Sequence, residues 1–199
     1  LDWTLFSGME NALHLGIWAG CFALAIRARN ESSYRVRKRL AIWLGLSGAL
    51  LVAVRPESGI CMALFGFFIA LPELSASQRN SRRIGRTVTL LLLVGLPGVL
   101  TLGAQAAANL SFTGELSANG AIAKLFANNP YLSTADRWDH FRGLLSYIVP
   151  RLVNHHFAAI PHLGWLVVGM GVLPLFSKRT RPVALLLWLQ IIGWLLIVS

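Results

Sequence analysis

Long apolar runs that alternate with short basic stretches constrain this sequence more than any other feature. The runs cover residues 8–26, 40–54, 57–72, 87–108, 157–176 and 183–199. A run of about 17–25 apolar residues is long enough to cross a membrane as one helix. The second and third runs approach that length only with their flanking residues, and Pro56 excludes a single helix through both. The sequence therefore predicts an all-α, polytopic transmembrane helix bundle with about six spanning segments, in one domain over residues 1–199.

The composition agrees with a membrane protein and argues against a nucleic-acid binder. Charged residues make up 13% of the chain, about half of the usual globular share. The formal net charge is +10 at pH 7, but the basic residues lie between apolar runs instead of along one soluble face. We therefore expect membrane lipid, and no nucleic acid, among the partners.

The basic residues also predict how the chain crosses the membrane. Basic stretches follow the first, third and fifth runs, and together they hold 13 of the 18 Lys and Arg residues. Alternating spans place these stretches on one side, which the positive-inside rule identifies as cytoplasmic. The opposite side receives six of the eight acids. We expect a multi-pass protein of the inner (plasma) membrane whose active face is extracytoplasmic and whose basic stretches act only as topology signals.

Residues 109–156 form the longest polar stretch, which we expect on the extracytoplasmic side. Within it, Ser133 and Asp136 have the spacing of a capping box, with Asp in place of the usual Glu. Trp138, Phe141 and Leu145 follow on one helical face. This pattern predicts an amphipathic helix that lies in the membrane interface, where it either covers protein or lines the access path of a lipid substrate.

Three charged residues on the expected outer face are candidates for a binding site. Ser7 would cap the first helix, so Glu10 would lie in the first turn, where the helix dipole favours an acid. Alternatively, Glu10 faces a polar cavity, where it could bind a cation or sugar hydroxyls. Arg55 and Glu57 flank Pro56, which would occupy the first position of the third helix. These two either form an ion pair at a helical hairpin turn, or Arg55 holds an anionic phosphate at the membrane surface.

Other candidate motifs are weaker. Neither a metal site nor a cofactor is predicted: His155, His156 and His162 have no Cys or carboxylate motif to complete a site, and a divalent metal is not indicated. Cys21 and Cys61 fall inside apolar runs and are expected to be small buried hydrophobic residues.

Small residues recur at four-residue spacing in the first run, at Ala12, Gly16 and Gly20. Such a stripe either lets a neighbouring helix approach closely or arises by chance in a span rich in Gly and Ala.

Motifs in a fixed order add a family resemblance. The stretches are SGME at 7–10, then LGLSG at 44–48, which leads through an apolar segment to RPESG at 55–59, and finally FTGELSANGAIAK at 112–124. The ordered set resembles the multispanning GT-C glycosyltransferases that use polyprenyl-phosphate sugars, especially bacterial mannosyltransferase-like and arabinofuranosyltransferase-like proteins, where the stretches read roughly SGMET, TRPEG and YGELLPNTFYAK. It covers about residues 3–150. Asn11 stands where Thr is usual, Ser58 separates Glu57 from Gly59, and Ala118 replaces Pro.

The resemblance implies an enzyme that moves a sugar from a polyprenyl-phosphate donor to an extracytoplasmic glycan, lipid or protein. Arg55 would contact the lipid phosphate, and Glu10 and Glu57 would make the cavity polar. The mouth of the cavity would be lined by Glu115, Asn119 and Lys124. The family's general base, an acid in the first outer loop, would lie upstream of residue 1, so we expect this chain to be an internal fragment.

Two other functions stay open at this stage. A transporter or lipid flippase would place ionisable groups near the bilayer midplane and show paired broken helices, and a non-catalytic scaffold would leave the outer acids scattered. The sequence predicts neither the sugar, the acceptor nor the oligomeric state.

Overall fold

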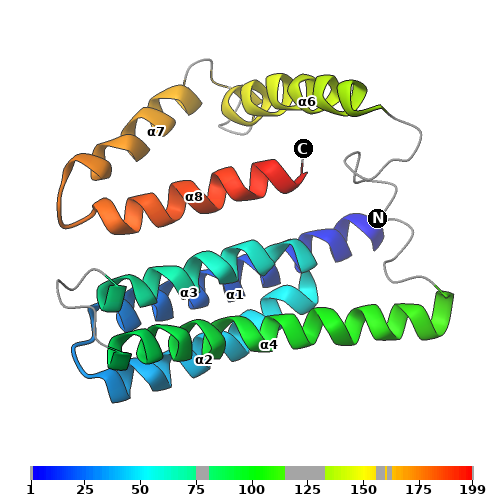
Figure 1. Ribbon diagram of the computed structural model, residues 1–199. Coiled ribbons are helices and arrows are strands. Elements are labelled where there is room, and N and C mark those ends of the chain that lie inside the picture. Colours follow the sequence, from blue (N-terminus) through cyan, green and yellow to red (C-terminus); the bar gives the residue numbers. More distant parts are fainter. Residues whose placement is uncertain (1, 75–80, 115–132, 156–159, 161–162, 199) are drawn as a thin grey trace. The chain divides into compact units, whose positions relative to one another are not determined.

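All regular secondary structure in the described part of the chain is helical. The computed structural model describes residues 2–74, 81–114, 133–155, 160 and 163–198, without the side chains of residues 2–10, 152, 155, 197 and 198. The chain divides into two compact units, Leu1–Ala108 and Asn109–Ser199, whose helices are drawn in Figure 1. The expectation of a single domain stays a prediction.

The described part of the first unit consists of four long helices and one short turn. These elements are α1 (Asp2–Asn30), α2 (Tyr34–Val54), the 3-10 turn η1 (Pro56–Ser58), α3 (Gly59–Leu74) and α4 (Ser81–Thr113), of which α4 continues past Ala108. Both α2 and α3 pack against α1. The core contains Cys21, Ala25, Leu44, Leu51, Val52, Cys61, Phe65, Ile69, Leu90 and Val94. The expectation that both cysteines are buried is confirmed.

Two helices extend beyond the apolar runs. Because α1 already includes Asp2, Ser7 lies inside a continuing helix and cannot cap it, since a capping residue needs a non-helical backbone. The prediction of a Ser7 cap with Glu10 in the first turn is therefore wrong. At its other end α1 continues through Arg27 and Arg29. Likewise α2 starts at Tyr34, well before its apolar run, because Arg and Lys are good helix formers.

Two helices of this unit, α2 and α4, approach each other closely at a glycine. A Cβ at Gly45 of α2 would collide with the backbone oxygen of Leu93 in α4. By contrast, the stripe of Ala12, Gly16 and Gly20 is exposed within this unit, and a Cβ at either glycine would meet nothing within 4 Å among the described residues. The stripe therefore does not mediate the described packing of α1, which buries Cys21 and Ala25 instead.

Prolines inside helices explain two of the contacts between helices. A proline has no N–H to donate to the carbonyl four residues earlier, and a carbonyl in the apolar part of a membrane must be satisfied within the protein. Pro72 in α3 leaves the Phe68 carbonyl oxygen without its usual helical donor. This oxygen instead accepts a hydrogen bond of 2.7 Å from Nη1 of Arg29 in α1. Pro97 in α4 likewise leaves the Leu93 carbonyl oxygen without its usual helical donor, and this oxygen lies against Gly45 of α2.

The second unit contains α6 (Thr134–His155), α7 (Leu163–Val172), the 3-10 turn η3 (Leu173–Phe176) and α8 (Arg181–Val198) in its described part. A Cβ at Gly164 of α7 would collide with the Val153 oxygen near the end of α6, so only glycine permits this approach. Trp188 of α8 donates its indole N–H to the Gly171 oxygen at 3.0 Å. Both contacts satisfy or shield carbonyls at or near helix ends, where no intrahelical donor is available.

The predicted capping box at the start of α6 is confirmed. The Asp136 N–H donates to Ser133 Oγ at 3.2 Å, and the Ser133 N–H donates to Asp136 Oδ2 at 3.2 Å. The Ser133 hydroxyl also donates to Asp136 Oδ2 at 2.6 Å. Each residue therefore satisfies a backbone donor of the other, as the reciprocal motif requires.

Among the described residues, three helical segments are long and apolar enough to cross a membrane: Asn11–Asn30, Pro56–Leu74 and Ser81–Thr113. Two further apolar segments, Leu163–Phe176 and Arg181–Leu196, are shorter, and α2 begins with a basic segment. By length and composition, the three long segments are typical of a membrane protein. Six spans, and an interfacial position for α6, stay predictions.

Candidate functional site

The turn between α2 and α3 positions the two candidate site residues that the structure describes with their side chains. Arg55 ends α2 in an extended conformation, with φ −143° and ψ 106°, as expected for a residue before proline. Pro56 then takes the first position of η1, which leads directly into α3. The expected proline at the start of this helical segment is therefore confirmed.

Arg55 contacts two different helical segments. Its Nη2 donates to Asn11 Oδ1 of α1 at 2.5 Å, and its Nη1 lies 3.8 Å from Glu57 Oε1. The Arg55 and Glu57 side chains are 28% and 30% exposed, and an ion pair with such geometry contributes at most about 1 kcal/mol. The expected ion pair is thus present but weak, and both side chains remain accessible to a ligand from outside the bundle.

A second contact joins α1 to the same turn. His14 Nε2 and Ser58 Oγ are 2.8 Å apart. Ser58 is buried, so its hydroxyl is poorly placed to meet a substrate, and the contact serves to hold α1 against η1. We call Asn11, His14, Arg55, Glu57 and Ser58 the Arg55 cluster.

His14 and Asn11 are site residues that the sequence did not identify. A signal was nevertheless present: His14 is a polar residue within an apolar run, and it lies one helical turn after Asn11 on the same face. Their common partner, the turn at Arg55, is 44 residues away in the chain. That separation is why the sequence pattern alone did not connect them.

α4 approaches the same end of the unit. Gln105 donates its side-chain amide to the Ala53 oxygen at 3.0 Å. This carbonyl belongs to the last turn of α2, where carbonyls have no intrahelical partner. The contact therefore completes the end of α2 just before Arg55.

The remaining candidate residues are described only in part or not at all. Glu10 lies in α1, directly before Asn11, but its side chain is outside the described part of the chain. The same holds for Glu115, Asn119 and Lys124 in full, and for His156 and His162 among the histidines. Among the residues that are described, no group of three metal-ligating side chains occurs.

The opposite end of the first unit carries most of its positive charge, and we call it the basic end. Asn11 and Arg29 are separated by 18 positions on α1, which corresponds to about 27 Å. The described basic residues of this end are Arg27, Arg29, Arg35, Arg37, Lys38, Arg39, Arg82, Arg83 and Arg86.

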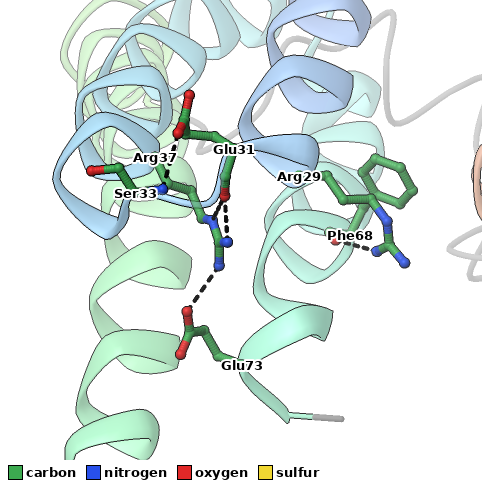
Figure 2. A network of polar contacts seen from close by, with 6 residues as sticks. All are labelled: Arg29, Glu31, Ser33, Arg37, Phe68 and Glu73. Carbon is green, nitrogen blue, oxygen red and sulfur yellow. Dashed lines mark hydrogen bonds and ion pairs between the residues drawn. The ribbon is translucent and has the colours of Figure 1, made fainter. Parts of the chain in front are cut away.

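The basic end is more than a topology signal. Figure 2 shows Arg37 between Glu31 and Glu73. Its Nη1 donates to Glu73 Oε1 at 2.8 Å, and its Nε and Nη2 donate to the backbone carbonyl oxygen of Glu31 at 3.2 and 2.6 Å. The Arg37 and Glu73 side chains are only 8% and 12% exposed. Arg29 also stacks over the Phe68 ring, 4.4 Å from its centroid. The expectation that these basic residues act only in topology is therefore wrong for Arg29 and Arg37.

Compared with models of protein families, with curated proteins and with solved structures, the chain matches none of them. The resemblance to GT-C glycosyltransferases therefore stays a prediction.

Proposed function

We propose that this chain forms part of a membrane glycosyltransferase that moves a sugar from a polyprenyl-phosphate donor to an extracytoplasmic acceptor. In this proposal the basic end faces the cytoplasm and the Arg55 cluster faces the other side. The separation of about 27 Å along α1 is close to the thickness of a hydrocarbon core, about 30 Å. Because α2 packs along α1, it would cross the membrane with the three long apolar segments.

The observation that carries the proposal is the Arg55 cluster. It holds a partly exposed guanidinium in place with Asn11 and Glu57, at the bundle end opposite the basic residues. A guanidinium is planar and can donate two parallel hydrogen bonds to a phosphate, which makes arginine suited to this ligand. An arginine at the edge of an apolar bundle fits a phosphate whose lipid chain lies in the membrane.

The proposed chemistry assigns Arg55 to the leaving group. The acceptor hydroxyl attacks the anomeric carbon of the sugar, the bond from that carbon to the phosphate oxygen breaks, and polyprenyl phosphate leaves with the bonding electrons. A cation beside the phosphate stabilises the charge that develops there. The hydroxyl proton goes to a carboxylate general base, which the resemblance places upstream of residue 1.

The other candidate residues have supporting roles in this proposal. Glu10 and Glu57 would keep the cavity polar enough for sugar hydroxyls. Glu115, Asn119 and Lys124 would line its mouth. No metal or organic cofactor is assigned a role.

We further propose that α6 lies in the membrane interface and borders the path of the lipid donor. Two exposed aromatic residues on this helix each make a cation–π contact with the arginine four positions later. Arg142 is 5.2 Å from the Trp138 ring centroid, and Arg151 is 5.3 Å from that of Tyr147. Aromatic rings are enriched at the headgroup level, where arginine can reach lipid phosphates. A half-buried apolar stripe that includes Phe141 and Ile148 would face the protein or the acyl chains.

The experiment compares sugar transfer by Arg55 variants of the full-length protein in proteoliposomes. The donors are polyprenyl-phosphate mannose and polyprenyl-phosphate arabinofuranose, each with a radiolabelled sugar. We expect Arg55→Ala to lower kcat/KM roughly 100-fold, the scale for the loss of one preorganised donor. Arg55→Lys keeps the charge but not the paired geometry and should lose less.

Two matched variants separate phosphate binding from folding. Asn11→Ala keeps Arg55 but removes the hydrogen bond that positions it, so it should lower the activity less than Arg55→Ala does. Arg27→Ala removes an exposed arginine from the basic end and should retain most of the activity. Normal transfer by Arg55→Ala would remove the phosphate role. If the wild-type protein transfers no sugar from either donor but moves the lipid between leaflets, the proposed function changes from transferase to flippase.

A further inference from the structure

The N-terminal ends of α2 and α4 meet at the basic end through a cation and an aromatic ring. The guanidinium of Arg86 in α4 lies 4.7 Å from the ring centroid of Tyr34 in α2. About two to three helical turns further along the two helices, Gly45 of α2 contacts Leu93 of α4. These two contacts establish which sides of the two helices face each other.

Helical periodicity then assigns further cations to these facing sides of α2 and α4. Lys38 lies between Tyr34 and Gly45 on the facing side of α2, and Arg82 lies one turn before Arg86 on the facing side of α4. All three cations are exposed. Both helices also direct their N-termini to this end, where the helix dipole adds positive potential.

In the described part of the chain, the two acids of this end, Glu31 and Glu73, contact groups other than Lys38, Arg82 and Arg86. Glu73 binds the buried Arg37, and Glu31 accepts the Ser33 N–H at 2.9 Å. The sequence has no other acid between Arg27 and Arg86 on this side of the expected spans. Positive potential therefore persists between α2 and α4.

We propose that Tyr34, Lys38, Arg82 and Arg86 form a binding site for the phosphate headgroup of an anionic phospholipid in the leaflet that faces the basic end. Basic pockets between membrane helices bind such headgroups, and tyrosine is enriched at the depth of the headgroups. Lysine and arginine can lay their aliphatic parts on the bundle and extend their charges to the lipid.

Apolar surface next to the cations favours a lipid over free phosphate. Deeper along the same helices, Ile42 of α2 is 39% exposed and Leu96 of α4 is 50% exposed within the unit. Acyl chains can cover this surface, whereas inorganic phosphate cannot. The site rests on the membrane placement proposed above but not on sugar transfer, and it lies at the opposite end of the bundle from the Arg55 cluster.

The test measures lipid binding in the purified full chain without any sugar donor, so its outcome is separate from that of the transfer assay. Binding of phosphatidylglycerol and of phosphatidylcholine is compared by native mass spectrometry and by the thermal shift that each lipid produces. The double variant Arg82→Gln/Arg86→Gln removes two charges of the site. The matched control, Lys178→Gln/Arg179→Gln, removes two exposed charges that precede α8.

We expect the wild type and the control to bind phosphatidylglycerol in preference to phosphatidylcholine, and the site variant to bind it roughly 30-fold more weakly, the effect of two cations at a lipid surface. Lys38→Gln, which leaves the contact between Arg86 and Tyr34 intact, should weaken it in the same direction. Equal losses in the site variant and the control would overturn the proposal, as would equal binding of the two lipids by the wild type. A thermal shift with inorganic phosphate as large as that with phosphatidylglycerol would also overturn it.

Discussion

Arg29 gives the sharpest test of how this bundle satisfies its backbone. Pro72 removes the N–H that would normally donate to the Phe68 oxygen, and Arg29 donates to that oxygen from another helix at 2.7 Å. If this is the role of Arg29, then restoring an N–H at position 72 makes the arginine largely dispensable. The perturbation is therefore a double-mutant cycle of Arg29→Met and Pro72→Ala.

The magnitude follows from the two contacts that Arg29 makes. A hydrogen bond to a charged group contributes about 1.5–3 kcal/mol, and a cation–π contact such as that to Phe68, at 4.4 Å, about 0.5–1 kcal/mol. We expect Arg29→Met alone to lower the free energy of unfolding by about 3 kcal/mol. With Pro72→Ala present, only the ring contact is lost, so the cost falls to about 1 kcal/mol.

The assay is unfolding by increasing SDS mole fraction in mixed micelles, followed by circular dichroism. Arg27→Met is the matched control, because Arg27 lies on the same helix and is exposed; it should change stability by no more than about 0.5 kcal/mol. An Arg29→Met cost that is the same with and without Pro72→Ala would refute the reasoning, since the arginine would then not replace the missing N–H.

Two further substitutions test the packing of the first unit. Glu73→Leu should cost about 3 kcal/mol in the same unfolding assay, because it leaves the buried Arg37 charge unpaired. Adding Arg37→Met should recover most of that loss, and an equally unstable double variant would contradict this account. Gly45→Ala should cost about 1–3 kcal/mol and lower the Tm, since its Cβ collides with Leu93. Gly95→Ala, with nothing within 4 Å, should leave the Tm unchanged or raise it, and equal Tm shifts for the two alanines would contradict the close approach.

Several features of the fold could be predicted from residues that are close together in the sequence. The alternation of apolar and basic segments indicated helices in the correct order, although six spans stay a prediction. Ser133 and Asp136 indicated a helix start, and Pro56 indicated the turn between α2 and α3; both are confirmed. These predictions succeeded because each depends on residues within about one helical turn of one another.

The helix ends and much of the candidate site were less predictable. The cap at Ser7 was wrong because no helix breaker separates it from Asp2, so α1 simply begins earlier. Arg55 and Glu57 were identified from their position beside Pro56, whereas Asn11 and His14 were not, since nothing local marks them as partners of that turn. Their roles in binding stay predictions.

The sequence by itself determined that these segments form apolar helices and where their basic flanks lie, because helical periodicity and hydropathy depend on neighbouring residues. The tertiary structure alone decided what the charges do. Arg29 and Arg37 meet partners 39 and 36 residues away, and which carbonyl or carboxylate each one meets depends on how α1, α2 and α3 pack. Burial then makes those contacts necessary, since a carbonyl freed by proline or a charge removed from water must find its partner within the protein.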